Sequence, residues 1–220
     1  MNLDQIISPS FPVLSPGDSG DRAMAIMEEN KCTQLPMVTE DGRYEALIQE
    51  NDLLNQENSN AALSTADFLH YKPAIIASAH PLEALRIFHQ MNLSVLPVID
   101  SEHNYIGTIT KDTLLKYMVE YSAIDTPGGI IVLEITPRNY SLYEIARICE
   151  NEDVVVLNTQ LHTNEIGMLE VTLKLNRNAL EAVVSSFERH NYHVKEVYGE
   201  IANNEDIEGK YNLLMNYINM

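Results

Sequence analysis

The pattern of hydrophobic and polar positions in the first half of the chain repeats at an interval of 61 residues. This shift pairs Leu35-Pro36 with Leu96-Pro97 and Val38 with Ile99, and the alignment needs no gap over residues 12–55. Because so many core-type residues fall in register at a single shift, the pattern indicates an internal duplication.

Each copy has the predicted order strand, helix, strand, strand, helix, because apolar residues at helical spacing alternate with short apolar runs bounded by turn residues. The first copy has predicted strands at Val13-Leu14, Leu35–Val38 and Tyr44–Ile48, and a closing helix from about Asn51. The second has predicted strands at Ala74–Ile76, Val95–Ile99 and Tyr105–Ile109, and a closing helix from about Lys111. A unit of this size buries little by itself. We therefore expect two βαββα domains, residues 1–60 and 61–124, that pack across a pseudo-twofold axis with a cleft between them.

A proline and two glycines within residues 125–129 mark a domain boundary. The order that follows is strand, helix, strand, strand, helix, strand: an apolar run at 130–135, helical spacing over 142–149 and 180–187, strict alternation over 169–175, and strands from about 154 and over 192–198. Ser141 and Glu144 fit a capping box at the first helix. This order predicts a ferredoxin-like βαββαβ domain over residues 128–200, within a mixed α/β (α+β) chain.

Residues 201–220 form the predicted C-terminal tail. Leu213, Leu214, Tyr217 and Ile218 would share one face of a helix. Such a face suits docking on the protein itself or on a dimer mate. A frayed terminus is the alternative.

Composition narrows the class of protein. The chain is 45% hydrophobic and 21% charged, which is typical of a globular protein. Its net charge of −18 argues against partners with clustered phosphates, so neither nucleic acid nor an anionic membrane is expected, whereas a basic partner protein stays open. No apolar run approaches the roughly 20 residues of a membrane span, and the N-terminus has no export signal, so we expect a cytoplasmic protein.

Catalytic and metal-binding patterns are weak. Two cysteines are too few for a disulfide framework or a four-thiolate zinc site, and His190 and His193 stand without further ligands, so no metal is expected. The sequence shows neither a nucleophile paired with a base nor a phosphate loop of the GxxxxGK[ST] kind. We therefore expect no enzyme activity.

The duplicated region resembles a pair of CBS (cystathionine β-synthase) domains. The second copy carries the resemblance best: Asp67–Pro73 is similar to the family's entry segment, Val95–Asp100 to its central strand, and Tyr105–Thr110 to the start of its glycine–hydrophobic–threonine motif. The resemblance implies a regulatory module that often binds adenosine nucleotides in the cleft between the copies and often forms a homodimer.

In the family motif, Ser or Thr follows a glycine by three residues and Asp follows it by six. A carboxylate there can accept hydrogen bonds from both ribose hydroxyls, and a hydroxyl can bind phosphate. The first copy has Ala46, Gln49 and Asp52 at these positions, and the second has Gly107, Thr110 and Thr113, so neither copy has the full set. Lys111 and Lys72 are the nearby cations. Asp52 and Thr110 can alternatively serve as helix caps. The candidate nucleotide-binding residues are Gln49, Asp52, Gly107, Thr110, Lys111 and Thr113, for AMP, ADP or ATP.

The C-terminal domain resembles an ACT domain, and the whole order resembles the acetoin-utilisation regulator type of CBS protein. ACT domains commonly bind amino acids through the loop between the first strand and first helix, which usually contains Asp and glycine. Here that loop is Thr136–Ser141 and has neither. Arg138 and Asn139 are the remaining candidates to hold a carboxylate, and a solvated loop is the alternative. Dimerisation through sheet edges does not depend on the glycine.

Two hypotheses follow for function. In the first, the protein is a non-catalytic sensor whose cleft takes an adenosine-type ligand and signals through the ACT-like domain. In the second, the protein is a dimeric interaction module with a vestigial cleft, which presents a fixed surface to an unidentified regulated protein.

Overall fold

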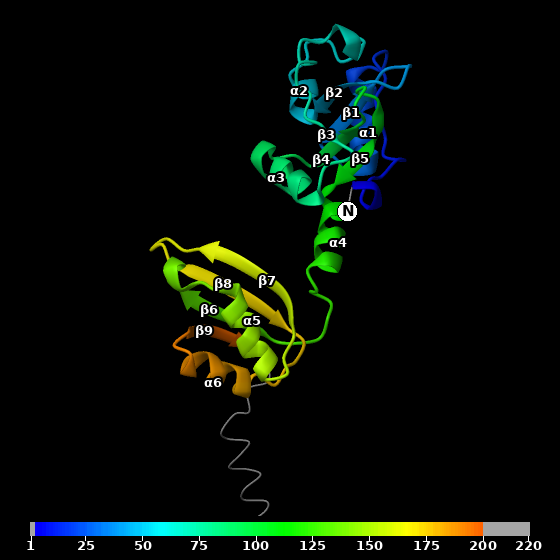
Figure 1. The fold of residues 1–220 in the computed structure, drawn as a ribbon. Coiled ribbons are helices and arrows are strands. Elements are labelled where there is room, and N and C mark those ends of the chain that lie inside the picture. The colour runs from blue at the N-terminus through cyan, green and yellow to red at the C-terminus, as the bar shows by residue number, and fades with distance from the viewer. Residues whose placement is uncertain (1–2, 200–220) are drawn as a thin grey trace, which may run out of the picture. The chain divides into compact units, whose positions relative to one another are not determined.

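A computed structural model describes residues 3–199, and the chain divides into two compact units, Met1–Met118 and Val119–Met220 (Figure 1). The first unit contains the duplicated region and the second contains the predicted ferredoxin-like domain. The apolar face predicted in the tail lies outside the described residues.

The first copy consists of helix α1 (Gly20–Asn30), strands β1 (Gln34–Val38) and β2 (Tyr44–Gln49) and the short helix α2 (Glu50–Leu54). The second consists of β3 (Ile75–Ile76), α3 (Pro81–Met91), β4 (Val95–Ile99), β5 (Tyr105–Thr110) and α4 (Lys111–Tyr121). Single 3₁₀ turns precede each copy, η1 (Leu3–Gln5) and η2 (Leu63–Thr65).

The strand predicted at Val13-Leu14 is shorter than expected. Only Leu14 pairs, in a parallel bridge with Met37. The chain turns away immediately afterwards, because the Asp18 carboxylate accepts a hydrogen bond from the backbone N–H of Ser15 at 2.8 Å.

Strand register confirms the duplication. β1 and β2 pair antiparallel from Gln34 opposite Gln49, and β4 and β5 pair antiparallel from Val95 opposite Thr110, 61 positions further along. Both ladders have an irregularity at the same point, before Val38 in one copy and before Ile99 in the other. The repeat in the sequence is therefore a repeat of backbone geometry.

The two copies are joined by paired backbone hydrogen bonds. The N–H of Tyr44 donates to the carbonyl of His103 at 3.1 Å, and the N–H of Tyr105 donates to the carbonyl of Gly42 at 2.8 Å. These two bonds are related by the 61-residue shift, so they lie across the predicted pseudo-twofold axis. The copies also share a core, since Tyr44 and Leu47 of the first copy are buried in the hydrophobic cluster of the second.

A buried polar contact lies at the same junction. The Gln34 side chain, which is 6% exposed, accepts hydrogen bonds at Oε1 from the backbone N–H of Ser94 at 2.7 Å and from its hydroxyl at 2.9 Å. Thr33, the counterpart of Ser94 in the first copy, has its Oγ1 atom 3.5 Å from the Ser94 hydroxyl. These contacts fix the register of the two copies against each other.

The second unit has the predicted ferredoxin-like order. It contains β6 (Ile130–Ile135), the 3₁₀ turn η3 (Pro137–Asn139), α5 (Leu142–Asn151), β7 (Val156–Thr163), β8 (Leu169–Leu175), α6 (Glu181–Arg189) and β9 (His193–Tyr198). The sheet order is β7-β8-β6-β9, and all neighbouring strands are antiparallel. Both helices cover one face of the sheet, where the alternating residues Val171, Leu173 and Leu175 of β8 are buried (Figure 1).

The predicted capping box at α5 is half formed. The Ser141 hydroxyl accepts from the backbone N–H of Glu144 at 3.3 Å, as expected. The Glu144 carboxylate pairs instead with Arg147, at 2.9 Å. Helix α5 therefore starts where the sequence predicts it.

Strand β7 starts two residues later than predicted. The backbone N–H of Val154 is still bonded to the Cys149 carbonyl in the last turn of α5, so this residue cannot yet pair in the sheet.

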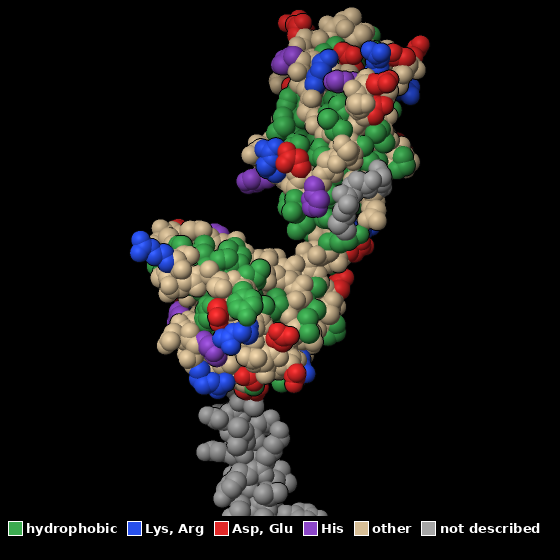
Figure 2. Space-filling view, viewed as in Figure 1, with side chains coloured by type: hydrophobic (Ala, Val, Ile, Leu, Met, Phe, Trp, Pro, Cys, Tyr) green, Lys and Arg blue, Asp and Glu red, His purple; other side chains and the backbone are tan. Residues whose placement is uncertain are grey.

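Among residues 3–199, no helix combines the length and the apolar character that crossing a membrane requires. On the face of the described residues shown in Figure 2, lysine and arginine side chains are interspersed with acidic ones.

Candidate functional site

The hydroxyls of the second-copy motif are engaged with each other. The Thr110 Oγ1 atom accepts from the backbone N–H of Thr113 at 3.2 Å, and the Thr113 Oγ1 atom accepts from the backbone N–H of Thr110 at 3.0 Å. This reciprocal arrangement caps the N-terminus of α4, so Thr110 has the structural role that the sequence left open.

Gly107 faces the N-terminal segment of the chain. A Cβ atom at this position would lie 2.5 Å from the Ile7 Cγ2 atom, 3.1 Å from the Ser8 carbonyl oxygen and 3.2 Å from the Pro9 Cα atom. The segment is also paired with β5, since Ser8 and Thr108 exchange two backbone hydrogen bonds of 2.8 and 3.2 Å. The glycine is therefore required by a close approach of the chain itself.

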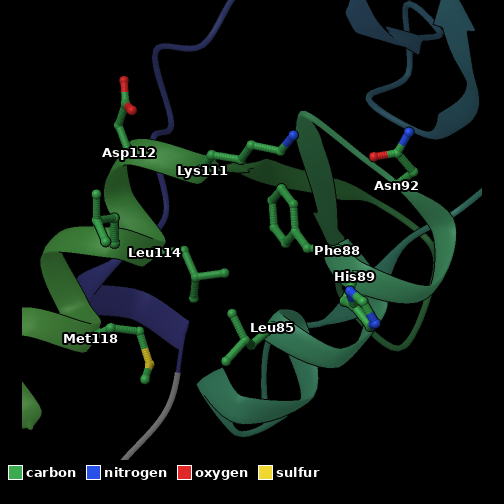
Figure 3. A pocket seen from close by; sticks show the side chains of 9 residues that line it. Leu85, Phe88, His89, Asn92, Lys111, Asp112, Leu114 and Met118 are labelled. Atoms are coloured by element: carbon green, nitrogen blue, oxygen red, sulfur yellow. The ribbon is translucent and has the colours of Figure 1, made fainter.

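Lys111, which directly follows Thr110, lines a groove between α3 and α4. The groove has a volume of about 480 Å³. Lys111 and Asp112 both line the groove, and in Figure 3 the Lys111 side chain extends towards Asn92 whereas the Asp112 side chain points in another direction. The floor is apolar and is formed by Leu85, Phe88, Leu114, Leu115 and Met118.

In the first copy, Gln49 is tied into the junction between the copies. Its Oε1 atom accepts from the Gln34 Nε2 atom at 3.3 Å, and Gln34 in turn contacts Ser94. The amide of Gln49 therefore belongs to the buried polar contact that holds the copies in register.

Asp52, by contrast, lines an open cleft. The N-cap residue of α2 is Gln49, and its side chain makes no capping hydrogen bond. Asp52 lies in the first turn of the helix, so it is not the N-cap residue that the sequence offered as an alternative. The cleft has a volume of about 480 Å³. It is lined by Asp52, by the linker residues Asn55, Gln56, Glu57, Asn58 and Ala61, and by Thr65, Ala66, Asp67 and Phe68.

Residues 65–68, which precede the second copy, were not among the predicted site residues. They reach the cleft because the chain after them runs beside β2, where the backbone N–H of Leu47 donates to the Tyr71 carbonyl at 2.9 Å. Burial, together with the nearby Asp52 carboxylate, raises the pKa of Tyr71. The similarity of Asp67–Pro73 to the CBS entry segment was the signal that could have pointed to them.

The family of the duplicated region is decided by a match to known domains. Residues 3–58 and 70–120 each match the CBS domain family, one match for each copy of the repeat. The chain carries two CBS domains.

Three curated proteins show the extent of the similarity. A CBS domain-containing protein from Dictyostelium discoideum is 25% identical over 132 residues, which are 54% of this chain and 91% of that protein. Inosine-5′-monophosphate dehydrogenase from Methanocaldococcus jannaschii is 25% identical over 133 residues, 59% of this chain and 26% of the enzyme. Homoserine O-acetyltransferase from Methanohalobium evestigatum is 24% identical over 123 residues, 54% of this chain and 24% of the enzyme. This chain therefore spans about a quarter of the length of either enzyme.

Two solved structures are similar to about half of this chain. A CBS domain pair/ACT domain protein from Thermotoga maritima has a TM-score of 0.48 and 16% identity, covering 55% of this chain and 98% of that one. The CBS-pair protein CBSX2 from Arabidopsis thaliana, in complex with AMP, has a TM-score of 0.48 and 20% identity, covering 54% of this chain and 96% of that one.

Within the CBS pair, the six candidate nucleotide-binding residues do not form one site. Asp52 lines the first-copy cleft, Lys111 lines the α3–α4 groove, and the polar groups of Gln49, Thr110 and Thr113 are bonded to neighbouring residues. Gly107 is packed against the N-terminal segment. The open carboxylate of Asp52 is thus the motif group best placed to meet a ligand.

Outside the CBS pair, the loop between β6 and α5 borders a further cavity, of about 450 Å³. Asn139 lines it, but Arg138 does not. Its lining includes the carboxylates of Glu134 and Glu144 and the imidazoles of His190 and His193. The described lining thus lacks a guanidinium or ammonium group to pair with a ligand carboxylate.

No group of three or more His, Cys, Asp or Glu side chains within residues 3–199 is arranged to hold a metal ion. His190 has its Nδ1 atom 2.8 Å from the Ser186 carbonyl oxygen, a contact that suits a ring N–H donor. Cys149 is 1% exposed, and burial raises the pKa of its thiol to about 11.

Proposed function

We propose that the chain is a non-catalytic regulatory protein whose CBS pair binds an adenosine-type ligand in the first-copy cleft. The observation that supports this most directly is the meeting of Asp52 with Asp67 and Phe68 in a cleft of about 480 Å³. Asp52 belongs to the first copy, and Asp67 and Phe68 belong to the segment that leads into the second. A cleft of this size is in the range of small-molecule sites.

The chemistry of the cleft suits a nucleoside. A carboxylate such as that of Asp52 can accept hydrogen bonds from both hydroxyls of a ribose. The half-buried Phe68 ring offers an apolar aromatic surface on which a base can stack. The amides of Asn55 and Asn58 each make one hydrogen bond within the chain, and their remaining Oδ1 and Nδ2 atoms supply an acceptor and a donor for the polar edge of the base.

The position of the cleft supports a regulatory role. Residues 65–68 lead into the segment that is bonded to β2 through Tyr71 and Leu47. A ligand that contacts both Asp52 and this segment binds more tightly to the arrangement in which they are close. It can shift the relative setting of the two copies only by its difference in affinity for the two states.

The remaining parts of the proposal rest on the sequence. We propose that the protein is a homodimer, that its second unit is an ACT-like domain through which the CBS pair signals, and that it is similar to the acetoin-utilisation regulator type of CBS protein. Amino-acid binding at Arg138 and Asn139, the absence of nucleic-acid and membrane partners, and the cytoplasmic location stay predictions.

A second candidate function is the dimeric interaction module. The α3–α4 groove favours it, because its apolar residues Leu85 and Leu115 are 39% and 64% exposed. Leu115→Arg should then weaken self-association in sedimentation equilibrium, and Leu54→Arg, at the equivalent position of the first copy, is the matched comparison. Unchanged self-association in the Leu115→Arg protein would remove this support.

Thermal unfolding with adenosine, AMP, ADP and ATP tests the ligand hypothesis. A ligand at 100 times its dissociation constant should stabilise the protein by about 2.7 kcal/mol. Asp52→Ala should abolish the stabilisation, whereas Asp112→Ala, an exposed carboxylate at the start of α4, should leave it unchanged. A flat response to all four compounds would refute the sensor hypothesis in favour of the interaction module.

A further inference from the structure

We propose that the first-copy cleft selects the uncharged nucleoside over its phosphorylated forms. This inference rests on the proposed function and specifies the ligand class of the same site. It follows from the charges that line the cleft, from the helix termini near it, and from the ion pair that Lys72 makes elsewhere.

The charged side chains lining the cleft are all acidic. Asp52, Glu57 and Asp67 contribute three carboxylates, and the described lining contains no lysine, arginine or histidine. A phosphate monoester would bring further negative charge close to these groups and would be repelled. A neutral nucleoside experiences no such repulsion.

The helix termini near the cleft do not compensate for this charge. Helix α2 has only five residues, and its first turn already contains Glu50 and Asp52. At the start of α1, the backbone N–H of Asp21 donates to the Ser59 carbonyl at 3.1 Å and that of Arg22 donates to the Ser19 hydroxyl at 3.3 Å. These amide groups are therefore used by the chain and do not form an anion site.

The lysine that the sequence suggested on this side is also engaged, and the His70 ring nitrogen Nδ1 is 3.0 Å from the Asp67 carbonyl oxygen. Lys72, which the sequence suggested as a phosphate ligand, does not line the cleft, and its Nζ atom is 3.2 Å from the Glu45 carboxylate. The net charge of −18 for the whole chain adds a general repulsion of anions.

The neutral groups of the cleft match what a nucleoside offers. Asn55, Asn58 and Thr65 line the cleft, and each side chain makes one hydrogen bond within the chain: Asn55 Nδ2 donates to the Asn51 carbonyl, Asn58 Oδ1 accepts from the Asn60 N–H, and the Thr65 hydroxyl donates to the Ala62 carbonyl. The Asn55 Oδ1, Asn58 Nδ2 and Thr65 Oγ1 atoms keep capacity for a further bond to a hydroxyl or a ring nitrogen. Gln56 also lines the cleft, but its Oε1 atom is buried and lies against Gly20, where an added Cβ atom would stand 2.7 Å from it. The Gln56 oxygen is therefore not counted among the groups that meet a ligand.

Isothermal titration of the full chain at low salt, with adenosine and with AMP, tests the selection. We expect adenosine to bind at least about tenfold more tightly than AMP, a difference of about 1.4 kcal/mol. The preference should shrink as salt is added, because the lining carboxylates of Glu57 and Asp67 are exposed and their field is screened. The titrations are run with EDTA and with Mg²⁺, since a divalent ion could bridge phosphate and carboxylate.

Charge-reversal variants identify the groups responsible. Glu57→Lys and Asp67→Lys should each reduce the ratio of the affinity for adenosine to the affinity for AMP. Glu102→Lys changes the net charge equally at an exposed position outside the cleft lining, and it should preserve the ratio. An equal reduction of the affinity ratio in the Glu102→Lys protein would overturn the inference, because the net charge of the chain would then explain the preference without the cleft carboxylates.

The outcomes separate this inference from the proposed function. Binding of AMP as tightly as adenosine, with EDTA or with Mg²⁺, would overturn the selection and leave the adenosine-type sensor intact. Failure of both compounds and of ATP to bind would refute the sensor itself.

Discussion

Replacing Gly107 with alanine tests whether this glycine serves the fold of the CBS pair. The added methyl would stand 2.5 Å from the Ile7 Cγ2 atom, whereas ordinary contacts begin at 3.4 Å. The Ile7 side chain would have to move by about 0.9 Å, the difference between these two distances. It cannot move freely, because the backbone atoms of Ser8 and Pro9 are also within 3.2 Å of the new methyl.

The magnitude follows from the anchoring of the N-terminal segment. Leu3 is fully buried and Ile6 is 5% exposed in the core of the second copy, and two hydrogen bonds tie Ser8 to Thr108. Overpacking in such a place costs about 1–3 kcal/mol. We expect Gly107→Ala to lower the free energy of unfolding by about 2 kcal/mol. With a typical denaturant slope of about 2 kcal/mol per molar urea, the unfolding midpoint should fall by about 1 M urea.

Urea unfolding followed by circular dichroism measures this loss. Gly17→Ala is the matched control: nothing lies within 4 Å of its added methyl, so its stability should be unchanged or raised by up to about 1 kcal/mol. In the Ile7→Ala, Gly107→Ala double variant the loss should be smaller than the sum of the single losses, because the nearest contact is gone. Hydrogen exchange at the Thr108 amide should accelerate in the single variant.

An unchanged urea midpoint together with an unchanged Thr108 exchange rate would refute the reasoning. That result would mean that the N-terminal segment can move away from the added methyl group without loss of stability. The need for glycine at this position would require another explanation, such as the approach of a ligand.

Three further predictions concern other contacts. Ser141→Ala should cost about 1 kcal/mol in unfolding free energy by removing the cap of α5, whereas Ser185→Ala on the exposed side of α6 should be nearly neutral, as chemical denaturation can show. Gln34→Ala should cost about 1–3 kcal/mol, because Ser94 loses the partner of both its N–H and its hydroxyl; an unaltered midpoint would contradict this. The raised pKa of Cys149, about 11 against an ordinary 9.0, means that the folded state holds the thiol proton more tightly, so stability is full below pH 9 and is lost as pH rises towards 11. Cys149→Ala should reduce this decline in denaturation curves from pH 8 to 11, and an identical decline would be evidence against it.

Much of the backbone could be predicted because it depends on local patterns. The 61-residue repeat in apolar positions predicted two copies with the same register, and β1–β2 and β4–β5 share it to the residue. Strict alternation located β8 at Leu169–Leu175, and the Ser141 cap located the start of α5. Where the pattern was short, as at Val13-Leu14, a local turn reduced the predicted strand to one bridge.

The candidate site was less predictable because the motif does not say which groups remain free. Spacing identified Thr110 and Thr113 as ligand hydroxyls, but each caps the other's backbone amide. Gln49 stands at a ligand-binding position of the motif, yet its side-chain oxygen accepts a hydrogen bond from Gln34. Such competition between local hydrogen bonds and ligand binding cannot be read from residue types alone.

The sequence by itself determined the duplicated βαββα order, the βαββαβ order after it and the separation of the motif carboxylate from the motif glycine. These depend on residue spacing along one chain. Only the tertiary structure decided that Thr65–Phe68 meet Asp52 in one acidic cleft, and that the N-terminal segment lies against Gly107. The N-terminal segment and Gly107 are far apart in the chain, and Thr65–Phe68 return to Asp52 because Phe68 packs against the core of the first copy. Both contacts depend on how a connecting segment packs on a domain, which no local pattern of residues predicts.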